Sequence, residues 1–363
     1  MEIYWLFFLF PATLALVGKA RDINVLSKYQ SLNIGPLWWL VVFALTMLIG
    51  LRYEVGGDWK NYIRLYNEFL TINSLADLEL SRDPGFQFIN YLSKLMGFYV
   101  YGVNLICGFI FSIGLAVFCR SLPRPLLALA VAVPFLVVVV SMGYTRQATA
   151  LGLAMIGLVS LVRGRKLSFV LWIILAITIH KSAILLLPIS VLASTKDRFW
   201  GVIWVGVIGI LFFTLLIEDS YRGLLNAYSN LDDPASQSSG AFIRLTMNIV
   251  PSILFLFYYK RFNLPELEKP LWRLFSLISI ILMGIYFMIP VSSALDRVAL
   301  YMIPLQMVVF SYLPDIFGTK YGIHRWIILF IICYYGLVLF VWLNYATHSH
   351  YWVPYNSLIF NLL

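Results

Sequence analysis

The sequence predicts an all-α membrane protein, a polytopic bundle of about twelve transmembrane helices that forms a single domain over residues 1–363. Two features of the composition predict this fold. Of the 363 residues, 61% are hydrophobic and only 12% are Asp, Glu, Lys or Arg, about half the ~25% usual in soluble domains. Twelve spans of about 20 residues take up about 240 positions, which leaves too few for a separate soluble domain. The composition therefore excludes a soluble enzyme, a disordered chain and a fibrous repeat.

The first expected span, Ile3–Val17, is preceded by Glu2 and followed by Lys19 and Arg21. A secretory signal carries its positive charge before the apolar core, so this order is reversed. We therefore expect an uncleaved helix with its N-terminus outside the cell. The other expected spans, in chain order, are Pro36–Leu51, Tyr99–Phe118, Leu126–Ser141, Ala148–Val162, Ser168–Ile179, Ala183–Ala193, Trp200–Ile217, Phe242–Tyr259, Leu271–Pro290, Val298–Leu313 and Trp326–Tyr345.

The apolar stretch Ser168–Ala193 is either one long helix or two short helices broken at His180 and Lys181. Cytoplasmic loops are enriched in Lys and Arg, and this bias decides between the two. With a break, the inner loops hold 16 of the 26 basic residues and only 5 of the 17 acidic ones. Without it, every later loop changes sides and the bias is weaker. We therefore expect a broken pair near His180. The net charge of +9 then reflects membrane topology and an anionic inner leaflet, and no nucleic-acid partner is expected.

Two long loops are expected on the extracytoplasmic side, over residues 52–98 and 218–241. In the first, apolar residues recur at three-residue steps from Phe86 to Leu95, inside the stretch Pro84–Met96. This pattern is typical of an amphipathic helix that lies in the membrane interface, and a short core helix is the alternative. The second loop is either a mobile lid or a plain connector.

Arginines occupy the outer ends of four expected spans, at Arg52, Arg146, Arg244 and Arg297. A single arginine in such a place is usually an interfacial anchor. Four of them, on the side that the positive-inside tendency disfavours, require partners. The carboxylates that could serve are Asp58, Asp83 and Asp296. An anionic ligand is the other kind of partner, because the guanidinium fork matches the oxygens of a phosphate. We therefore expect an outward-facing cationic site that suits a diphosphate on a lipid.

His180 lies at the expected break and is followed by Lys181 and Ser182. A lone histidine in an apolar run is more often structural, although ionisable groups within membrane spans are usually functional. Gln147 follows Arg146 at the start of a span, where a helix N-terminus itself favours anions.

The cysteines lie in apolar runs and are interpreted as small hydrophobic residues, not as metal ligands or a disulfide framework. His348 and His350 form an HxH pair, but this pair lies in the C-terminal tail. We expect no metal site and no cofactor, although a divalent ion held by Asp58 and Asp83 remains open.

Five short motifs follow one another along the chain: Arg52 with Gly57-Asp58-Trp59 and Tyr62; Asp83-Pro84-Gly85-Phe86; Arg146-Gln147; His180-Lys181-Ser182-Ala183; and Asp296-Arg297 with Tyr301. With these motifs in this order, the chain resembles the EpsG family of bacterial multi-span proteins, which are similar to Wzy-type polysaccharide polymerases. The resemblance covers roughly residues 40–310. The family more often has Tyr in place of Trp59, and Glu in place of Asp83 and Asp296. The two carboxylates of this chain are therefore one methylene shorter, which bears on any role that needs a fixed reach.

The resemblance implies a glycosyltransferase of the GT-C type in the bacterial cytoplasmic membrane, with its active site on the extracytoplasmic face. Its substrates would be oligosaccharide repeat units on undecaprenyl diphosphate, joined to make O-antigen, capsule or exopolysaccharide. Membrane lipid, a chain-length regulator and a flippase are the other partners that it suggests. The alternatives are a flippase of lipid-linked oligosaccharides, which usually has two related halves and access from both faces, an O-antigen ligase and a membrane acyltransferase.

This reaction assigns a role to each candidate residue. Preorganised cations stabilise the charge of a leaving diphosphate, and a base takes the proton of the attacking hydroxyl. The expected diphosphate ligands are Arg146 and Arg297, followed by Arg52 and Arg244. The candidate bases are Asp58, His180 and Asp83, in that order. Further substrate contacts are expected from Trp59, Tyr62, Gln147, Lys181 and Tyr301. The aromatics Trp59, Tyr62 and Tyr66 either stack on sugar rings or anchor the interface.

Overall fold

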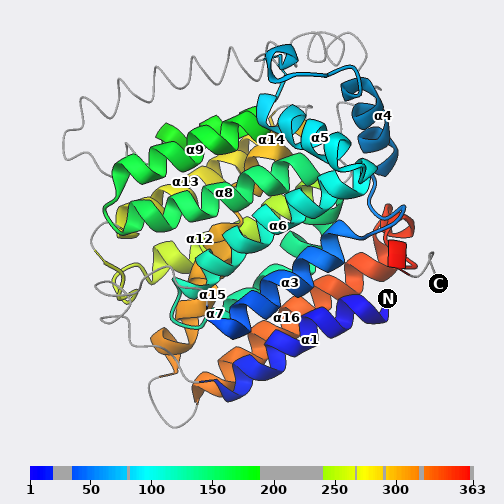
Figure 1. Ribbon diagram of the computed structural model, residues 1–363. Coiled ribbons are helices and arrows are strands. Elements are labelled where there is room, and N and C mark those ends of the chain that lie inside the picture. The colour runs from blue at the N-terminus through cyan, green and yellow to red at the C-terminus, as the bar shows by residue number, and fades with distance from the viewer. Residues whose placement is uncertain are drawn as a thin grey trace.

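The computed structural model describes residues 1–18, 35–79, 82–188, 240–265, 268–288, 292–318 and 323–359. Within these ranges every regular element is a helix, and the one β pairing is an isolated bridge between Arg52 and Ser357. Figure 1 shows a bundle of long helices with the shorter helices α4 and α5 at one end. The expected all-α class is confirmed.

The bundle is built from fifteen described helical elements, and prolines begin four of its α-helices, where a missing N–H costs nothing. The elements up to residue 188 are α1 (Glu2–Val17), α3 (Pro36–Gly50), α4 (Trp59–Phe69), α5 (Pro84–Met96), α6 (Tyr99–Arg120), α7 (Pro125–Ala132), the π-helix η2 (Val133–Ser141), α8 (Thr145–Val162), α9 (Lys166–Ile179) and the 3₁₀ helix η3 (Lys181–Leu185). The later elements are α12 (Ala241–Phe257), α13 (Glu268–Tyr286), α14 (Ser292–Leu300), α15 (Pro304–Phe317) and α16 (Ile323–Tyr345). Single 3₁₀ turns, η1 (Leu75–Asp77) and η5 (Ser349–Tyr351), add to these.

Five described helices are long and apolar enough to cross a membrane. They are Tyr99–Arg120, Thr145–Val162, Glu268–Tyr286, Leu295–Phe317 and His324–Tyr345. Five shorter apolar helices coincide with other expected spans: Glu2–Val17, Pro36–Gly50, Pro125–Ser141, Lys166–Ile179 and Ala241–Phe257. The chain is therefore a helical membrane protein, while the number of twelve spans stays a prediction.

The expected break near His180 is present. Helix α9 ends at Ile179, His180 is extended with φ −155° and ψ 115°, and η3 follows. Of the span expected over Ala183–Ala193, only the part to residue 188 is described. The span Trp200–Ile217 lies outside the described residues, as does the loop 218–241 except for its last two positions.

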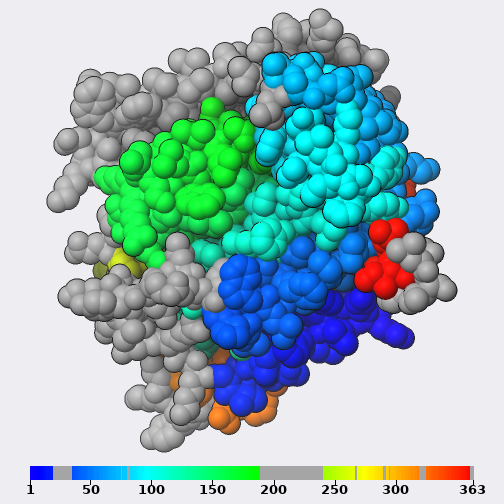
Figure 2. Space-filling view, viewed as in Figure 1, coloured from blue at the N-terminus to red at the C-terminus, as the bar shows by residue number. Residues whose placement is uncertain are grey.

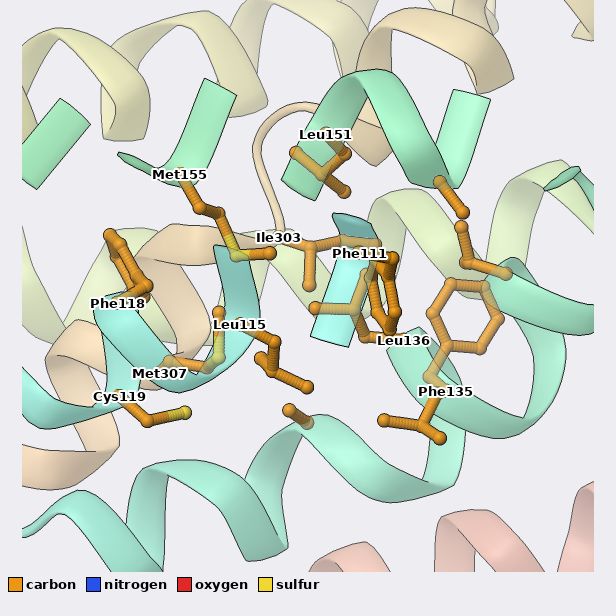
Figure 3. Packing of buried hydrophobic residues seen from close by; sticks show 14 of the residues in the cluster. Phe111, Leu115, Phe118, Cys119, Phe135, Leu136, Leu151, Met155, Ile303 and Met307 are labelled. Carbon is orange, nitrogen blue, oxygen red and sulfur yellow. The ribbon is translucent and has the colours of Figure 1, made fainter. Parts of the chain in front are cut away.

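Helices α6 and α8 form the centre of the bundle. In the most apolar stretch of α8, 89% of the residues are buried. The corresponding share in α16, which lies at the periphery, is 28%. Helix α6 packs against α3 and α8, and α8 also packs against α9. Figure 3 shows Phe111 and Leu115 of α6 facing Leu151 and Met155 of α8, with Leu136 of η2 beside them. This close packing is possible because both helices carry glycine where their backbones meet, as small residues do in membrane bundles.

The π-helix η2 extends α7 and is buried along its whole length. Pro134 near its start lacks an N–H and its ring displaces the carbonyl of the preceding turn, which favours the wider winding. The carbonyl of Val138 in this π-helix accepts a hydrogen bond of 2.7 Å from the Trp352 indole. A residue of the C-terminal tail is thereby fixed beside the start of α8.

Helix α5 matches the stretch for which an amphipathic helix was the expectation. Phe86 and Ile89 are buried, while Phe88 and Leu95 are exposed. Its buried face packs on α6 and α9, as the alternative of a short core helix requires. Placement in the membrane interface stays a prediction.

A glycine substitution tests the central contact. A Cβ atom at Gly114 of α6 would lie 2.0 Å from the backbone oxygen of Gly152 in α8. We expect Gly114→Ala to lower the free energy of unfolding by about 1–3 kcal/mol, because two backbones must separate. The measurement is thermal unfolding in detergent.

The matched control is Gly284→Ala in α13, where a Cβ atom would meet nothing within 4 Å. This variant should unfold like the wild type or slightly later. Equal stability of the two variants would contradict the packing described.

Candidate active site

Five ionisable side chains from five segments converge at one end of the bundle, where α3 and α16 end and α6 and α8 begin. We call this end the site end. Asp58 precedes α4, Asp83 precedes α5, Arg146 lies in the first turn of α8, His180 follows α9, and Arg297 lies in α14. All five are among the residues that the sequence nominates, and the fold brings them together from positions up to 239 apart in number.

Asp83 is held close to His180 by the residues that follow it. Pro84 starts α5, and Asp83 itself adopts the left-handed region at φ 49° and ψ 66°, which is strained for a residue other than glycine. A Cβ atom at Gly85 would lie 2.4 Å from Thr178 Oγ1, so glycine lets α5 begin directly against the last turn of α9. The motif Asp-Pro-Gly-Phe therefore fixes where the carboxylate sits.

The Asp83 carboxylate bridges a cation and an imidazole. Its Oδ2 accepts a hydrogen bond of 3.0 Å from Arg146 and lies 4.0 Å from His180 Nδ1. The other oxygen, Oδ1, and the His180 Nδ1 are both buried and have no hydrogen-bond partner among the described residues. Buried polar atoms in native proteins are almost always satisfied, so these two atoms are candidates for contact with a ligand or water.

Arg146 combines a fixed position with partial exposure. Its backbone N–H donates to the Tyr62 hydroxyl at 3.3 Å, and its guanidinium lies 5.6 Å from the centre of the Phe86 ring. The side chain is 31% exposed despite its ion pair with Asp83. It therefore presents a positive charge at the N-terminus of α8, where backbone N–H groups also favour an anion.

Asp58 and Arg297 are the less constrained members of the site. Burial raises the pKa of the Asp58 carboxyl above its ordinary value, although the guanidiniums of Arg146 and Arg297 act in the opposite direction. Asp58 does not use its carboxylate to cap α4. Arg297 is exposed, and among the described residues no carboxylate lies within 4.0 Å of its guanidinium. Both side chains remain available to a substrate.

Gln147 and Tyr301 are buried and join the helices that carry these residues. The Gln147 side chain donates a hydrogen bond of 2.6 Å to the backbone carbonyl of Arg297, which ties α8 to α14. The Tyr301 hydroxyl accepts a hydrogen bond of 3.2 Å from Ser182, which ties the end of α14 to η3. Both side chains are buried. Lys181 is half-buried at the start of η3.

The sequence suggests that Arg52 binds the diphosphate, whereas in the structure its guanidinium is buried and hydrogen-bonded within the protein. Arg52 is 1% exposed. It donates to the backbone carbonyls of Ile49 and Val55, to Asn104 at 3.1 Å and to Thr145 at 2.7 Å. Four of its five N–H groups are thereby used inside the protein. It joins the end of α3 to α6 and α8, next to Arg146.

Arg244 likewise differs from Arg146 and Arg297. It forms a buried, bidentate ion pair with Asp296 that joins α12 to α14. Both side chains are about 95% buried. Because this pair uses the guanidinium fork, we place Arg244 with the residues that hold the site and not with those that contact a diphosphate.

The aromatics expected to stack on sugars are packed inside. Trp59 lies under the Arg52 guanidinium at 5.9 Å and contacts Tyr53 and Tyr101. Tyr62 contacts Phe86, and Tyr66 contacts Tyr99. All three rings are 5–6% exposed, so no open ring face is left for a sugar.

The sequence analysis missed Asn104 and Thr145, which hold Arg52. A polar residue such as Asn104 inside an apolar run is a signal for a buried partner, but the sequence does not name that partner. Among the described residues no group of three or more His, Cys, Asp or Glu side chains is placed to hold a metal ion.

Comparison with protein families gives a match of residues 36–357 to the EpsG family. The chain belongs to the EpsG family. The matched range contains all five motifs and all five ionisable side chains of the site. EpsG-family proteins are similar to Wzy-type polysaccharide polymerases, so membership indicates a polymerase-like role in polysaccharide production. Comparisons with curated proteins and with solved structures found no match.

The two kinds of arginine can be separated by stability. Arg244→Ala leaves the Asp296 carboxylate buried without its bidentate partner, and we expect a loss of about 3–5 kcal/mol in unfolding free energy. Arg297→Ala removes an exposed side chain and should change it by less than about 1 kcal/mol. Thermal unfolding of both variants in detergent measures the difference. Equal losses would contradict the division between holding and exposed arginines.

Proposed function

We propose that this EpsG-family protein is a polysaccharide polymerase of the bacterial cytoplasmic membrane. It joins oligosaccharide repeat units carried on undecaprenyl diphosphate, and it does so on the extracytoplasmic face, to make O-antigen, capsule or exopolysaccharide. One observation carries the proposal: two solvent-accessible arginines lie around the half-buried Asp58 carboxylate. Arg146 is partly exposed and ion-paired to Asp83, and Arg297 is exposed without an acidic partner among the described residues.

The leaving group is stabilised by Arg146 and Arg297. When the bond between the anomeric carbon and the diphosphate oxygen breaks, its electron pair stays on that oxygen, and undecaprenyl diphosphate gains negative charge. The guanidiniums of Arg146 and Arg297 and the N-terminus of α8 oppose this charge. The arginines neutralise a diphosphate through bidentate hydrogen bonds.

The acceptor is activated by Asp58. An oxygen of an acceptor sugar hydroxyl attacks the anomeric carbon, and its proton passes to the Asp58 carboxylate. Asp83 has a positioning role, because its Oδ2 holds Arg146. Oδ1 of Asp83 and Nδ1 of His180 are buried and have no hydrogen-bond partner among the described residues, which supports a contact with hydroxyls of a donor sugar once it binds.

The direct test is a defined reaction. Purified protein is incubated with one undecaprenyl-diphosphate-linked repeat unit, and the products are separated on a gel. We expect a ladder of polymer from the wild type. Arg146→Ala and Arg297→Ala should each lower the rate by at least about 100-fold, as loss of one preorganised donor does, while Arg→Lys at the same sites keeps part of it.

Asp58→Asn should abolish the ladder but still bind the donor, since the amide cannot accept the proton. The variant Arg64→Ala, which removes an exposed side chain of α4, is the matched control and should polymerise normally. Full-length polymer from both arginine variants would show that they are not the clamp. Transbilayer movement of the lipid in vesicles, with no ladder, would instead identify a flippase, and transfer only to a lipid A core would identify a ligase.

The rate should depend on pH through Asp58. The base must be ionised, and burial raises its pKa, so kcat/KM should fall as the pH drops through a value above the ~3.9 of an ordinary Asp. Arg297 lowers the pKa of Asp58. In Arg297→Gln the acid limb of the residual activity should therefore move to higher pH, whereas Arg297→Lys should leave it in place. An unchanged limb in Arg297→Gln would show that another group is the base.

A further inference from the structure

An exposed cluster of one tyrosine and two histidines lies at the site end, in the segment that follows α16. We call His348, His350 and Tyr351 the tail cluster. Tyr351 is 43% exposed. Its ring centre lies 4.0 Å from that of His350, and 6.1 Å from that of His348, to which it is nearly parallel at 27°. Figure 2 shows the red C-terminal residues on the surface, next to the blue segment that follows α3.

The tail cluster is held in place by the residue that follows it. The neighbouring residue Trp352 is 3% exposed. Its indole donates to the Val138 carbonyl at 2.7 Å, and its own carbonyl accepts a hydrogen bond of 2.8 Å from Tyr4. The Trp352 ring also contacts Trp342 edge-on at 5.4 Å. The backbone that carries Tyr351 is therefore held in place before any ligand binds, as a binding site requires.

The tail cluster borders the loop of the candidate base. The backbone N–H of Gly56 donates to the Tyr351 carbonyl at 2.9 Å. A Cβ atom at Gly57 would lie 3.9 Å from Cδ2 of Tyr351, so the loop of Asp58 runs beside this edge of the ring. Asp58 is the next residue, and it interacts with Arg146 and Arg297. A ligand on Tyr351 would therefore lie beside the loop that carries Asp58.

The chemistry of the tail cluster matches a sugar. The face of an aromatic ring is negative, and it attracts the polarised C–H groups on the flat face of a pyranose. Imidazoles bind the hydroxyl edge. His350 Nδ1 lies 3.1 Å from the Thr347 carbonyl, which can only accept, so Nδ1 carries the proton and Nε2 of the neutral ring accepts from a hydroxyl. We propose that the tail cluster is a saccharide-binding site, and that it holds the acceptor glycan beside Asp58.

The identification of the bound sugar as the acceptor rests on the proposed function, whereas sugar binding itself can be measured without turnover. The probe is the repeat-unit oligosaccharide released by mild acid from the lipid-linked precursor of the same cells. Its affinity for the full-length protein in detergent and EDTA is measured by calorimetry. We expect Tyr351→Ala to weaken the binding about three- to tenfold, as loss of an aromatic contact does, and Tyr351→Phe to restore it.

The matched control is Tyr345→Ala. Tyr345 is an exposed tyrosine at the end of α16. It is close to Tyr351 in sequence, and its aromatic contact is with Phe340 and not with the loop of Asp58. Its variant should bind the oligosaccharide like the wild type. Wild-type affinity in Tyr351→Ala would overturn the proposal. Equal weakening in Tyr345→Ala would reassign both tyrosines to membrane anchoring, and loss of wild-type binding in EDTA would point to a metal at His348 and His350.

The gel assay and the binding measurement together separate this proposal from the proposed function. If the wild type makes a ladder and Tyr351→Ala binds the sugar normally, the saccharide site is wrong and the polymerase stands. If the wild type makes no ladder but binds the oligosaccharide through Tyr351, the polymerase is wrong and the saccharide site stands. If both hold, Tyr351→Ala should raise the KM for the acceptor and shorten the ladder at an unchanged KM for the donor.

Discussion

The site end depends on one buried guanidinium. Arg52 cannot be neutralised in a protein, and a charge taken out of water must be surrounded by polar partners. Its partners come from Ile49, Val55, Asn104 and Thr145, which fixes the end of α3 against α6 and α8. Thr145 is the residue before Arg146, and Val55 begins the turn that leads to Asp58. The position of Arg146 relative to Asp58 therefore follows from the hydrogen bonds of a third, fully buried residue.

The remaining charges divide into two groups by solvent access. Arg52 and the pair of Arg244 with Asp296 are buried and satisfied within the protein. Arg146, Arg297 and Asp58 retain exposure. The proposed transfer from a lipid diphosphate needs both groups, because exposed cations can bind a diphosphate together only where a rigid frame fixes their spacing. Glycine makes that frame compact, at Gly114 between α6 and α8 and at Gly85 between α5 and α9.

The sequence is sufficient for the helical class, for helices at ten of the twelve expected spans and for the break at His180, because apolar runs and the polar residues that interrupt them are local properties. It is also sufficient to name the five side chains that converge. It cannot separate Arg52 and Arg244 from Arg146 and Arg297. The four look alike along the chain, and the partners that distinguish them, such as Thr145 and Asp296, lie 93 and 52 positions away. For the same reason it assigns sugar contacts to Trp59 and Tyr62, whose rings are buried by tertiary packing.

The ion pair of Arg244 with Asp296 has a consequence for biosynthesis. Translation delivers α12 to the membrane before the 52 residues that lead to Asp296 have been made. An arginine in a transmembrane helix with no partner costs several kcal/mol in hydrocarbon. We therefore expect α12 to reach its final position only after Asp296 has been made, so that α12 and α14 settle in the bundle together.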